Sequence, residues 1–511
     1  MNKVPGLANI DWIIIVLYAS STVFLGWFYG RKQKTTKEYF TGSGKMNPIL
    51  IGVSLFASLL STITYLSQPG EIIGKGPVFL SSYLTYPFVF LIVGFLILPV
   101  YMRLRVTSAY ELLEERLGLS VRLLGASMFL LLRLVWMSLL ILAATKAFCS
   151  IADIDPKWLP WMVAVIGSIS LFYASMGGLR AVVITDLMQT ILLYGGAILV
   201  VVFVSIKMEG FNWFPTQWHQ NWDKQPFFSL DPSTRITMVG SFFSVLIWYV
   251  ATSGGDQLSV QRFMSTRDAR DARKSIGIQL IIAMIVGVTL GFAGLAMLGY
   301  FQQYPDLLPD GFSLKSKADQ VFPYFIAHQL PPVISGLVTA GMLAAAMSSM
   351  DSGVNSISAV LTTDFIDRLS HKPMTELGHV RFARWLAVIV GLIVLGGSML
   401  VDLVPGNITA VTGKTVNLLT VPIFSLFLFA LFFKKASPAG VWTGWFFGTS
   451  AAILVAFSGP IFGFLEDGRD PVSFQWTGPV ALAVNVITGL VFSVLFPKKK
   501  PFLIANSGDS E

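Results

Sequence analysis

Long apolar stretches recur along the 511-residue chain, and they limit its fold more than any other feature. A helix that crosses a bilayer needs about 20 consecutive, mostly apolar residues. Stretches of this kind occupy residues 10–29, 48–69, 79–102, 120–149, 158–177, 181–206, 236–257, 275–301, 330–365, 383–402, 408–433, 437–459 and 475–496. The sequence therefore predicts an all-α integral membrane protein, with about 13 transmembrane helices in one polytopic domain over residues 1–511.

The composition supports this interpretation and excludes several other classes of protein. Hydrophobic residues make up 54% of the chain and charged residues 13%, whereas soluble domains carry about 25% charged residues. The single cysteine, Cys149, excludes an internal disulfide framework, and four histidines are too few for a His-rich metal or haem site. No span carries a histidine-based or paired acid–base constellation. We therefore expect neither an enzyme nor an organic cofactor.

The basic residues predict an orientation in the membrane, because short cytoplasmic loops collect Lys and Arg. Most of the 36 Lys and Arg residues fall in alternate connections, among them Arg103, Arg122, Arg262, Arg368 and Lys434. This pattern places the N-terminus outside and the C-terminus in the cytoplasm, in a plasma membrane or a bacterial inner membrane. The net charge of +8 then reflects topology, so we do not expect a nucleic-acid partner.

Two of the predicted spans contain residues that interrupt helices. The second span is rich in small and hydroxyl residues from Gly52 to Thr64 and ends at Pro69-Gly70, and the seventh runs through Ala251-Thr252-Ser253-Gly254-Gly255-Asp256-Gln257. Freed backbone groups at such breaks are able to coordinate ions near the middle of a membrane. The two spans are five helices apart, which is the spacing of two inverted five-helix repeats. Close packing of small residues is the alternative explanation.

Three carboxylates fall within or near predicted spans: Asp186, Asp256 and Asp351. Each costs at least about 2.5–3.5 kcal/mol at the bilayer centre and so needs a reason to be there. Next to Asp351, one helical face carries Ala345, Ser348, Ser349 and Ser352. Hydroxyl, carboxylate and carbonyl oxygens suit a hard cation, and the few formal charges favour Na+ over Ca2+. The alternatives are a helix-packing stripe and, for Asp186, an ordinary helix N-terminal residue.

Three cationic residues also fall within spans. Lys146 is able to extend to the membrane surface, and Arg133 is able to pair with a loop carboxylate. Lys414 precedes Asn417 and Pro422 in the eleventh span. A cation beside a discontinuous helix is suited to an anionic or hydroxyl-rich substrate, so we expect Lys414 to contribute to a binding site.

Several separated motifs together resemble the sodium/solute symporter family, which includes sodium-coupled sugar, sialic acid, monocarboxylate, proline and iodide transporters. The motifs are Gly52 to Thr64 with Phe56-Ala57-Ser58, Thr107-Ser108-Ala109-Tyr110-Glu111, Met176-Gly177-Gly178 with Thr185-Asp186, Asp256-Gln257 with Val260-Gln261-Arg262, and Ala345-Ala346-Met347-Ser348-Ser349. The resemblance covers nearly the whole chain. It implies a LeuT-type inverted repeat over residues 48–206 and 236–433, with an extra N-terminal helix at 10–29 and two C-terminal helices in 437–496.

The resemblance also implies two cation sites. The first Na+ site takes the backbone carbonyls of Ala57, Leu60 and Ala345 and the hydroxyls of Ser348 and Ser349. The second, found in some members, uses the positions of Asp186, Ser348, Asp351 and Ser352. Those members carry a hydroxyl where this chain has Asp351. The carboxylate either strengthens a second cation site, allows a proton to replace sodium, or forms a packed hydrogen bond.

The resemblance predicts symport of a small organic solute with Na+ by alternating access, by a protein that functions as a monomer. Trp136 occupies the position at which sialic-acid-like members carry an arginine, with Arg133 one turn earlier. Lys414 favours a small organic anion, whereas Trp136 favours a sugar or polyol. A sensor or a channel on the same fold is the alternative of another class, although the short polar tail supplies no output domain. We expect the substrate-binding residues to be Ser61, Thr64, Gln68, Ser82, Trp136, Lys414 and Asn417.

Overall fold

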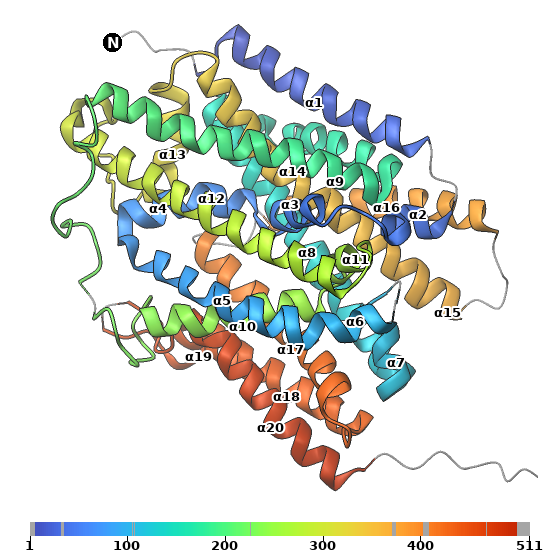
Figure 1. Ribbon diagram of the computed structural model, residues 1–511. Coiled ribbons are helices and arrows are strands. Elements are labelled where there is room, and N and C mark those ends of the chain that lie inside the picture. The colour runs from blue at the N-terminus through green and yellow to red at the C-terminus, as the bar shows by residue number, and fades with distance from the viewer. Residues whose placement is uncertain are drawn as a thin grey trace, which may run out of the picture.

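The computed structural model describes residues 6–31, 35–104, 106, 108–224, 226–369, 375–401, 408–466 and 468–497. Throughout these ranges the regular structure is helical, and no strand occurs in them. The long helices pack side by side as one bundle, with α1 at one edge and α18 and α20 at the opposite edge (Figure 1). The prediction of an all-α membrane protein is therefore confirmed.

The helices that make up the bundle follow the predicted apolar stretches. They are α1 (Asn9–Gly30), α3 (Pro48–Leu59), α4 (Thr62–Lys75), α5 (Tyr86–Leu91), α6 (Leu98–Leu104), α8 (Leu119–Ile151), α9 (Leu159–Lys207), α10 (Met238–Gly255), α11 (Gln257–Met264), α12 (Ala269–Gln303), α14 (Ile334–Val360), α16 (Glu376–Val401), α17 (Ile408–Phe432), α18 (Pro438–Ala456) and α20 (Thr477–Leu495). Short helices lie at the ends of the bundle, including α2 (Thr36–Thr41), α7 (Glu111–Leu117), α13 (Ala318–His328), α15 (Asp367–Leu369) and α19 (Ser458–Phe462).

Ten helices among the described residues are long and apolar enough to cross a membrane, or eleven if the bent pair α3 and α4 forms one span. One of them, α9, covers two predicted stretches, and Gly178 interrupts it with a φ of 54° and a ψ of −175°. Glycine adopts that conformation because it lacks a Cβ. The total of thirteen spans stays a prediction.

The second predicted span is broken where α3 meets α4, with a bend of 68° between the two helices. Leu60 and Ser61 adopt extended backbone conformations, and the Ser61 hydroxyl accepts a hydrogen bond from the Thr64 amide to begin α4. The expected end at Pro69-Gly70 is wrong, since α4 continues through Pro69 to Lys75. The break frees backbone groups at Leu60 and Ser61 rather than at the proline.

The seventh predicted span is broken at Asp256, between α10 and α11. Asp256 has an extended backbone, and its Oδ1 accepts a hydrogen bond of 2.9 Å from the Leu258 amide. The carboxylate therefore caps α11 while ending α10. Both interruptions expected from small residues and breakers are present.

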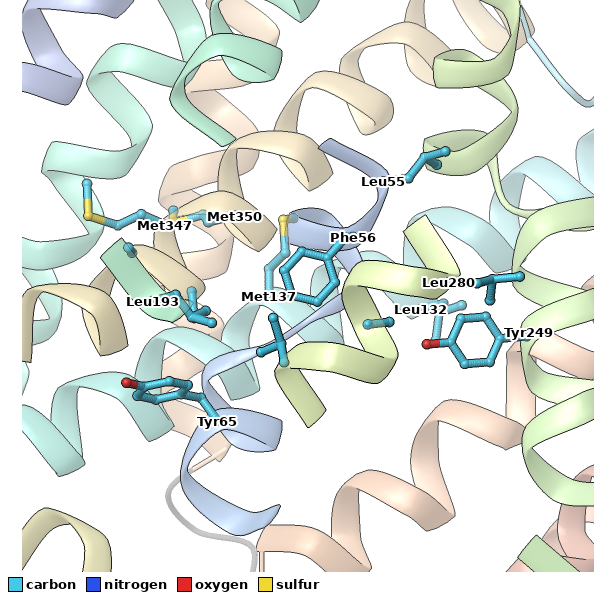
Figure 2. Packing of buried hydrophobic residues seen from close by; sticks show 14 of the residues in the cluster. Leu55, Phe56, Tyr65, Leu132, Met137, Leu193, Tyr249, Leu280, Met347 and Met350 are labelled. Atoms are coloured by element: carbon cyan, nitrogen blue, oxygen red, sulfur yellow. The ribbon is translucent and has the colours of Figure 1, made fainter. Parts of the chain in front are cut away.

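The core of the bundle forms around α14, nearly all of whose residues are buried. This helix packs against α1, α3, α8, α9 and α16. Figure 2 shows Phe56 of α3, Met137 of α8 and Met350 of α14 within this buried cluster. The hydroxyl-rich face of α14 is thus held against the broken α3 by apolar packing on both sides.

Two residues that we assigned to cytoplasmic loops lie inside the protein instead. Arg262 is fully buried in α11, and Arg122 is buried at the start of α8, where its Nε donates to Asp364 at 2.7 Å. Arg262 was assigned to a loop because the short helix α11, which follows a break, has no hydrophobic signature, and Arg122 because it lies in the first turn of α8. Thr107 and the basic residues Lys32, Lys34, Arg105, Lys372 and Lys498–Lys500 lie outside the described residues.

Candidate functional site

A cavity of about 220 Å³, which we call the first cavity, lies beside both helix breaks. Residues from α3, α4, α8, α10 and α17 line it together with Asp256. Its polar lining includes Ser61, Thr64, Arg133, Trp136, Asp256 and Asn417. A concave site next to interrupted helices is where transporters bind their substrates.

Two charged residues line the first cavity: Arg133, which is buried on α8, and Asp256, with which it forms an ion pair. The Nε of Arg133 has no hydrogen-bond partner among the described residues. Because Asp256 also caps α11, the ion pair joins α8 to the break between α10 and α11. A buried guanidinium with an unused donor is suited to bind a carboxylate.

The hydroxyl face of α14 meets the break between α3 and α4. The Ser349 hydroxyl lies 3.4 Å from the carbonyl oxygen of Leu60, the residue that directly follows α3. Ala57 and Ala345 are buried on the same two helices. These groups form an oxygen-rich environment, which fits a hard monovalent cation.

A fully buried cluster of two carboxylates and one guanidinium adjoins the hydroxyl face of α14: Asp186, Asp351 and Arg262. Asp186 accepts hydrogen bonds of 2.5 Å from both Ser348 and Ser54 and contacts Arg262 at 3.4 Å. The cluster therefore contains one more carboxylate than guanidinium, which leaves a formal negative charge for a cation to balance.

Ser352 contacts both Asp351 and Arg262 of this buried cluster. Its hydroxyl lies 3.2 Å from Oδ1 of Asp351 and accepts a hydrogen bond of 2.5 Å from Arg262. It also lies 2.8 Å from the hydroxyl of Ser58 on α3. The predicted second cation site and the first helix break are thus linked through a chain of hydroxyl groups.

The sodium:solute symporter family matches residues 39–448, which is most of the chain. The chain belongs to this family. The family assignment made from the separated motifs is therefore confirmed, and the protein is a multi-pass membrane transporter by fold and family.

Individual relatives of this symporter are similar over nearly its whole length. The sodium/sialic acid symporter SiaT of Proteus mirabilis is 27% identical over 517 residues, covering 98% of each chain. Sodium-coupled monocarboxylate transporter 1 of Mus musculus is 26% identical over 480 residues, covering 92% of this chain and 75% of that transporter.

Solved structures show the same fold. A substrate-bound, outward-open sodium-coupled sialic acid symporter matches with a TM-score of 0.82 and 25% identity, covering 96% of this chain and 100% of that one. Mhp1, a nucleobase-cation-symport-1 family transporter, matches with a TM-score of 0.58 and 11% identity, covering 92% and 97%. The predicted LeuT-type fold of this symporter is confirmed, whereas its inverted repeat stays a prediction.

The predicted substrate residues of the symporter fall into three places. Ser61, Thr64, Trp136 and Asn417 line the first cavity. Thr64 also borders a neighbouring cavity of about 170 Å³, together with Gln68 and Ser82. Lys414 lines neither cavity, and its Nζ forms an ion pair of 2.8 Å with Asp470. The expected contact of Lys414 with an anion is therefore taken by a carboxylate of the protein itself.

Sequence reasoning missed two cationic residues of this symporter site. Arg133 was interpreted as the partner of a loop carboxylate, whereas its partner Asp256 is one of the intramembrane carboxylates. Arg262 follows Asp256 by six residues, and a helix restarting at that break carries it back into the protein. The signal available was the break itself, since residues after a break remain at membrane depth.

Proposed function

We propose that this symporter is a secondary active carrier that couples inward Na+ movement to the uptake of a small organic anion by alternating access. The observation that carries the proposal is the buried Arg133 in the lining of the first cavity. The sialic acid and monocarboxylate named for the relatives are both anions, which supports the same substrate class. The proposal is transport rather than catalysis, by a monomer in a plasma membrane or bacterial inner membrane with the N-terminus outside.

The coupling cation is proposed to bind the carbonyl oxygens of Ala57, Leu60 and Ala345 and the hydroxyls of Ser348 and Ser349. These groups lie on α14 and on both sides of the break that ends α3. Since α3 lies in the first predicted repeat and α14 in the second, a cation bound between them favours one arrangement of the two helices. Loss of the cation to the cytoplasm then removes that preference and releases the substrate.

Replacing Ser349 with alanine tests the first cation site. We expect Ser349→Ala to raise the half-saturating Na+ concentration for uptake about tenfold, because one oxygen ligand is lost. Ser358→Ala is the matched control, since the Ser358 hydroxyl donates only to the Val354 carbonyl of the same helix. Equal sodium activation curves for Ser349→Ala and Ser358→Ala at equal protein level contradict the assignment.

A second cation is proposed to bind at Asp186, Ser348, Asp351 and Ser352, near Arg262. The energetics support two cations for an anionic substrate. One Na+ with one monovalent anion moves no net charge, so a tenfold sodium gradient contributes only about 1.4 kcal/mol. Two Na+ ions contribute about 2.8 kcal/mol and move one net charge, which adds about 2.3 kcal/mol per 100 mV.

Replacing Asp351 with asparagine tests the second cation site. We expect Asp351→Asn to abolish the stimulation of uptake by an inside-negative potential, because one cation per cycle is lost. The measurement is uptake into vesicles with and without a potassium diffusion potential, together with the Na+ to substrate ratio. If the wild-type ratio is one and Asp351→Asn leaves sodium dependence unchanged, the second site is wrong.

A sodium-coupled sugar or polyol symporter is the second candidate function. One observation favours it: the neighbouring cavity with Gln68 and Ser82 has no charged residue in its lining. A thermal-shift screen in Na+ and in K+ separates the two functions. We expect carboxylic acids to raise the unfolding temperature only in Na+, and sodium-dependent stabilisation by neutral sugars alone rejects the anion proposal.

A further inference from the structure

Three cationic residues share one face at the start of α12. Arg270, Arg273 and Lys274 lie in its first two turns at positions i, i+3 and i+4, which is the spacing of one helical face. Helix α12 has 35 residues and is therefore about 52 Å long, whereas the hydrocarbon core of a bilayer is about 30 Å thick. The ends of α12 extend beyond the hydrocarbon, so the three cations lie at the depth of the lipid headgroups.

The acidic residues nearest to this face are occupied by other partners. Oδ1 of Asp268 accepts a hydrogen bond of 2.9 Å from the Asp271 amide and so caps α12. The carboxylate of Asp271 forms an ion pair of 2.6 Å with Nε of Arg267. Among the described residues, no carboxylate forms an ion pair with Arg273. The face therefore keeps a net positive charge.

Arg273 is the member of this face that the fold holds in place. Its guanidinium lies 4.2 Å from the ring centroid of Phe95, in the π-helical segment Ile92–Ile97 between α5 and α6. A Cβ at Gly94 would lie 2.9 Å from Cγ of Arg273, so the glycine allows the arginine to lie against that segment. Nε of Arg273 is enclosed and has no hydrogen-bond partner among the described residues, which leaves its two terminal nitrogens to bind a ligand. A guanidinium positioned in this way is suited to bind a phosphate group.

Apolar side chains continue from this cationic face along both neighbouring elements. Helix α12 packs against α5 and against the segment Ile92–Ile97. Leu91 and Phe95 on one side, and Ile281 and Met284 on the other, each expose between 41% and 57% of their surface. In a membrane such side chains contact lipid tails, which are as apolar as leucine. A phosphate-binding group at headgroup depth, next to an exposed apolar surface, is complementary to an anionic phospholipid.

We infer that this surface of α12 and the segment Ile92–Ile97 binds an anionic phospholipid, with the lipid phosphate at Arg273. Arg270 and Lys274 strengthen the attraction, because each Lys or Arg near an anionic headgroup adds to the affinity. The acyl chains lie along Leu91 and Ile281. None of these residues lines the first cavity or its neighbour, so the inference does not depend on the proposed substrate.

Removal of two cations tests the lipid site. The affinities of the purified full chain for phosphatidylglycerol and phosphatidylcholine are measured by titration and native mass spectrometry. We expect the wild type to bind phosphatidylglycerol at least about 30-fold more tightly than phosphatidylcholine. Arg270→Gln/Arg273→Gln lowers the affinity for phosphatidylglycerol about 30-fold and that for phosphatidylcholine less than about twofold. Arg270→Gln alone, at an exposed residue, lowers the affinity for phosphatidylglycerol about fivefold and decides the test if the double variant folds poorly.

Lys434→Gln/Lys435→Gln is the matched control, because it removes the same charge from two exposed residues between α17 and α18. It leaves both affinities unchanged. Equal affinities of the wild type for the two lipids, unchanged binding by the arginine variants, or an equal loss in the control variant overturns the site. Displacement of phosphatidylglycerol by an equal concentration of glycerol phosphate also overturns it, because the site would then bind a soluble phosphate without acyl chains.

Discussion

Arg133→Gln is expected to lower the sodium-dependent uptake of an acidic substrate, expressed as kcat/KM, by about 100-fold or more. Among the described residues that line the first cavity, the guanidinium is the only cation, and it is buried. A hydrogen bond between charged groups contributes about 1.5–3 kcal/mol, and a carboxylate left unpaired in a buried site costs more. The measurement is initial uptake of the acid that gives the largest sodium-dependent thermal shift.

A double variant separates binding from folding at this position. Arg133→Gln alone leaves Asp256 buried without its partner, so part of its effect is structural. The double variant Arg133→Gln/Asp256→Asn removes both charges, and asparagine still caps α11. We expect it to recover stability but not uptake. Recovery of uptake by the double variant contradicts a role for Arg133 in recognising the anion.

Arg262→Met is expected to destabilise the protein by about 3–5 kcal/mol, because it leaves Asp186 and Asp351 buried without the guanidinium. Arg262 also loses its hydrogen bonds to Ser54 and Ser352, of 2.8 and 2.5 Å. The apparent unfolding temperature of the purified protein should fall by about 3–5 °C.

The compensating variant distinguishes this charge balance from simple loss of packing. Arg262→Met/Asp186→Asn removes one carboxylate together with the guanidinium, so we expect it to regain most of the lost stability. An unfolding temperature of Arg262→Met equal to that of the wild type contradicts the charge balance. So does a double variant that is less stable than the single one.

The sequence was sufficient to predict the broad architecture and the polar face of α14. Apolar stretches of membrane length identify helices whatever their packing, and the small residues and breakers near Ser61 and Asp256 indicate interruptions. The stripe of Ser348, Ser349 and Ser352 follows from helical periodicity alone. These features are local, so neighbouring residues suffice to predict them.

The electrostatic partners could not be predicted in the same way, because they depend on contacts between distant segments. Lys414 pairs with Asp470, and Arg133 pairs with Asp256 more than a hundred residues away. Arg262 has the composition of a loop residue, although α11 carries it into the core. Only the packing of α8, α11, α14 and α17 determines which ion pair lines a cavity and which lies outside it.

Uptake by purified protein in liposomes tests the central claim of sodium-coupled anion transport most directly. The labelled acid is supplied outside, with an inward Na+ gradient in one sample and equal Na+ on both sides in the other. The account predicts transient accumulation above equilibrium only with the gradient, and its loss when K+ replaces Na+. Equilibration to the same level and at the same rate in both samples would show facilitated diffusion and contradict the account.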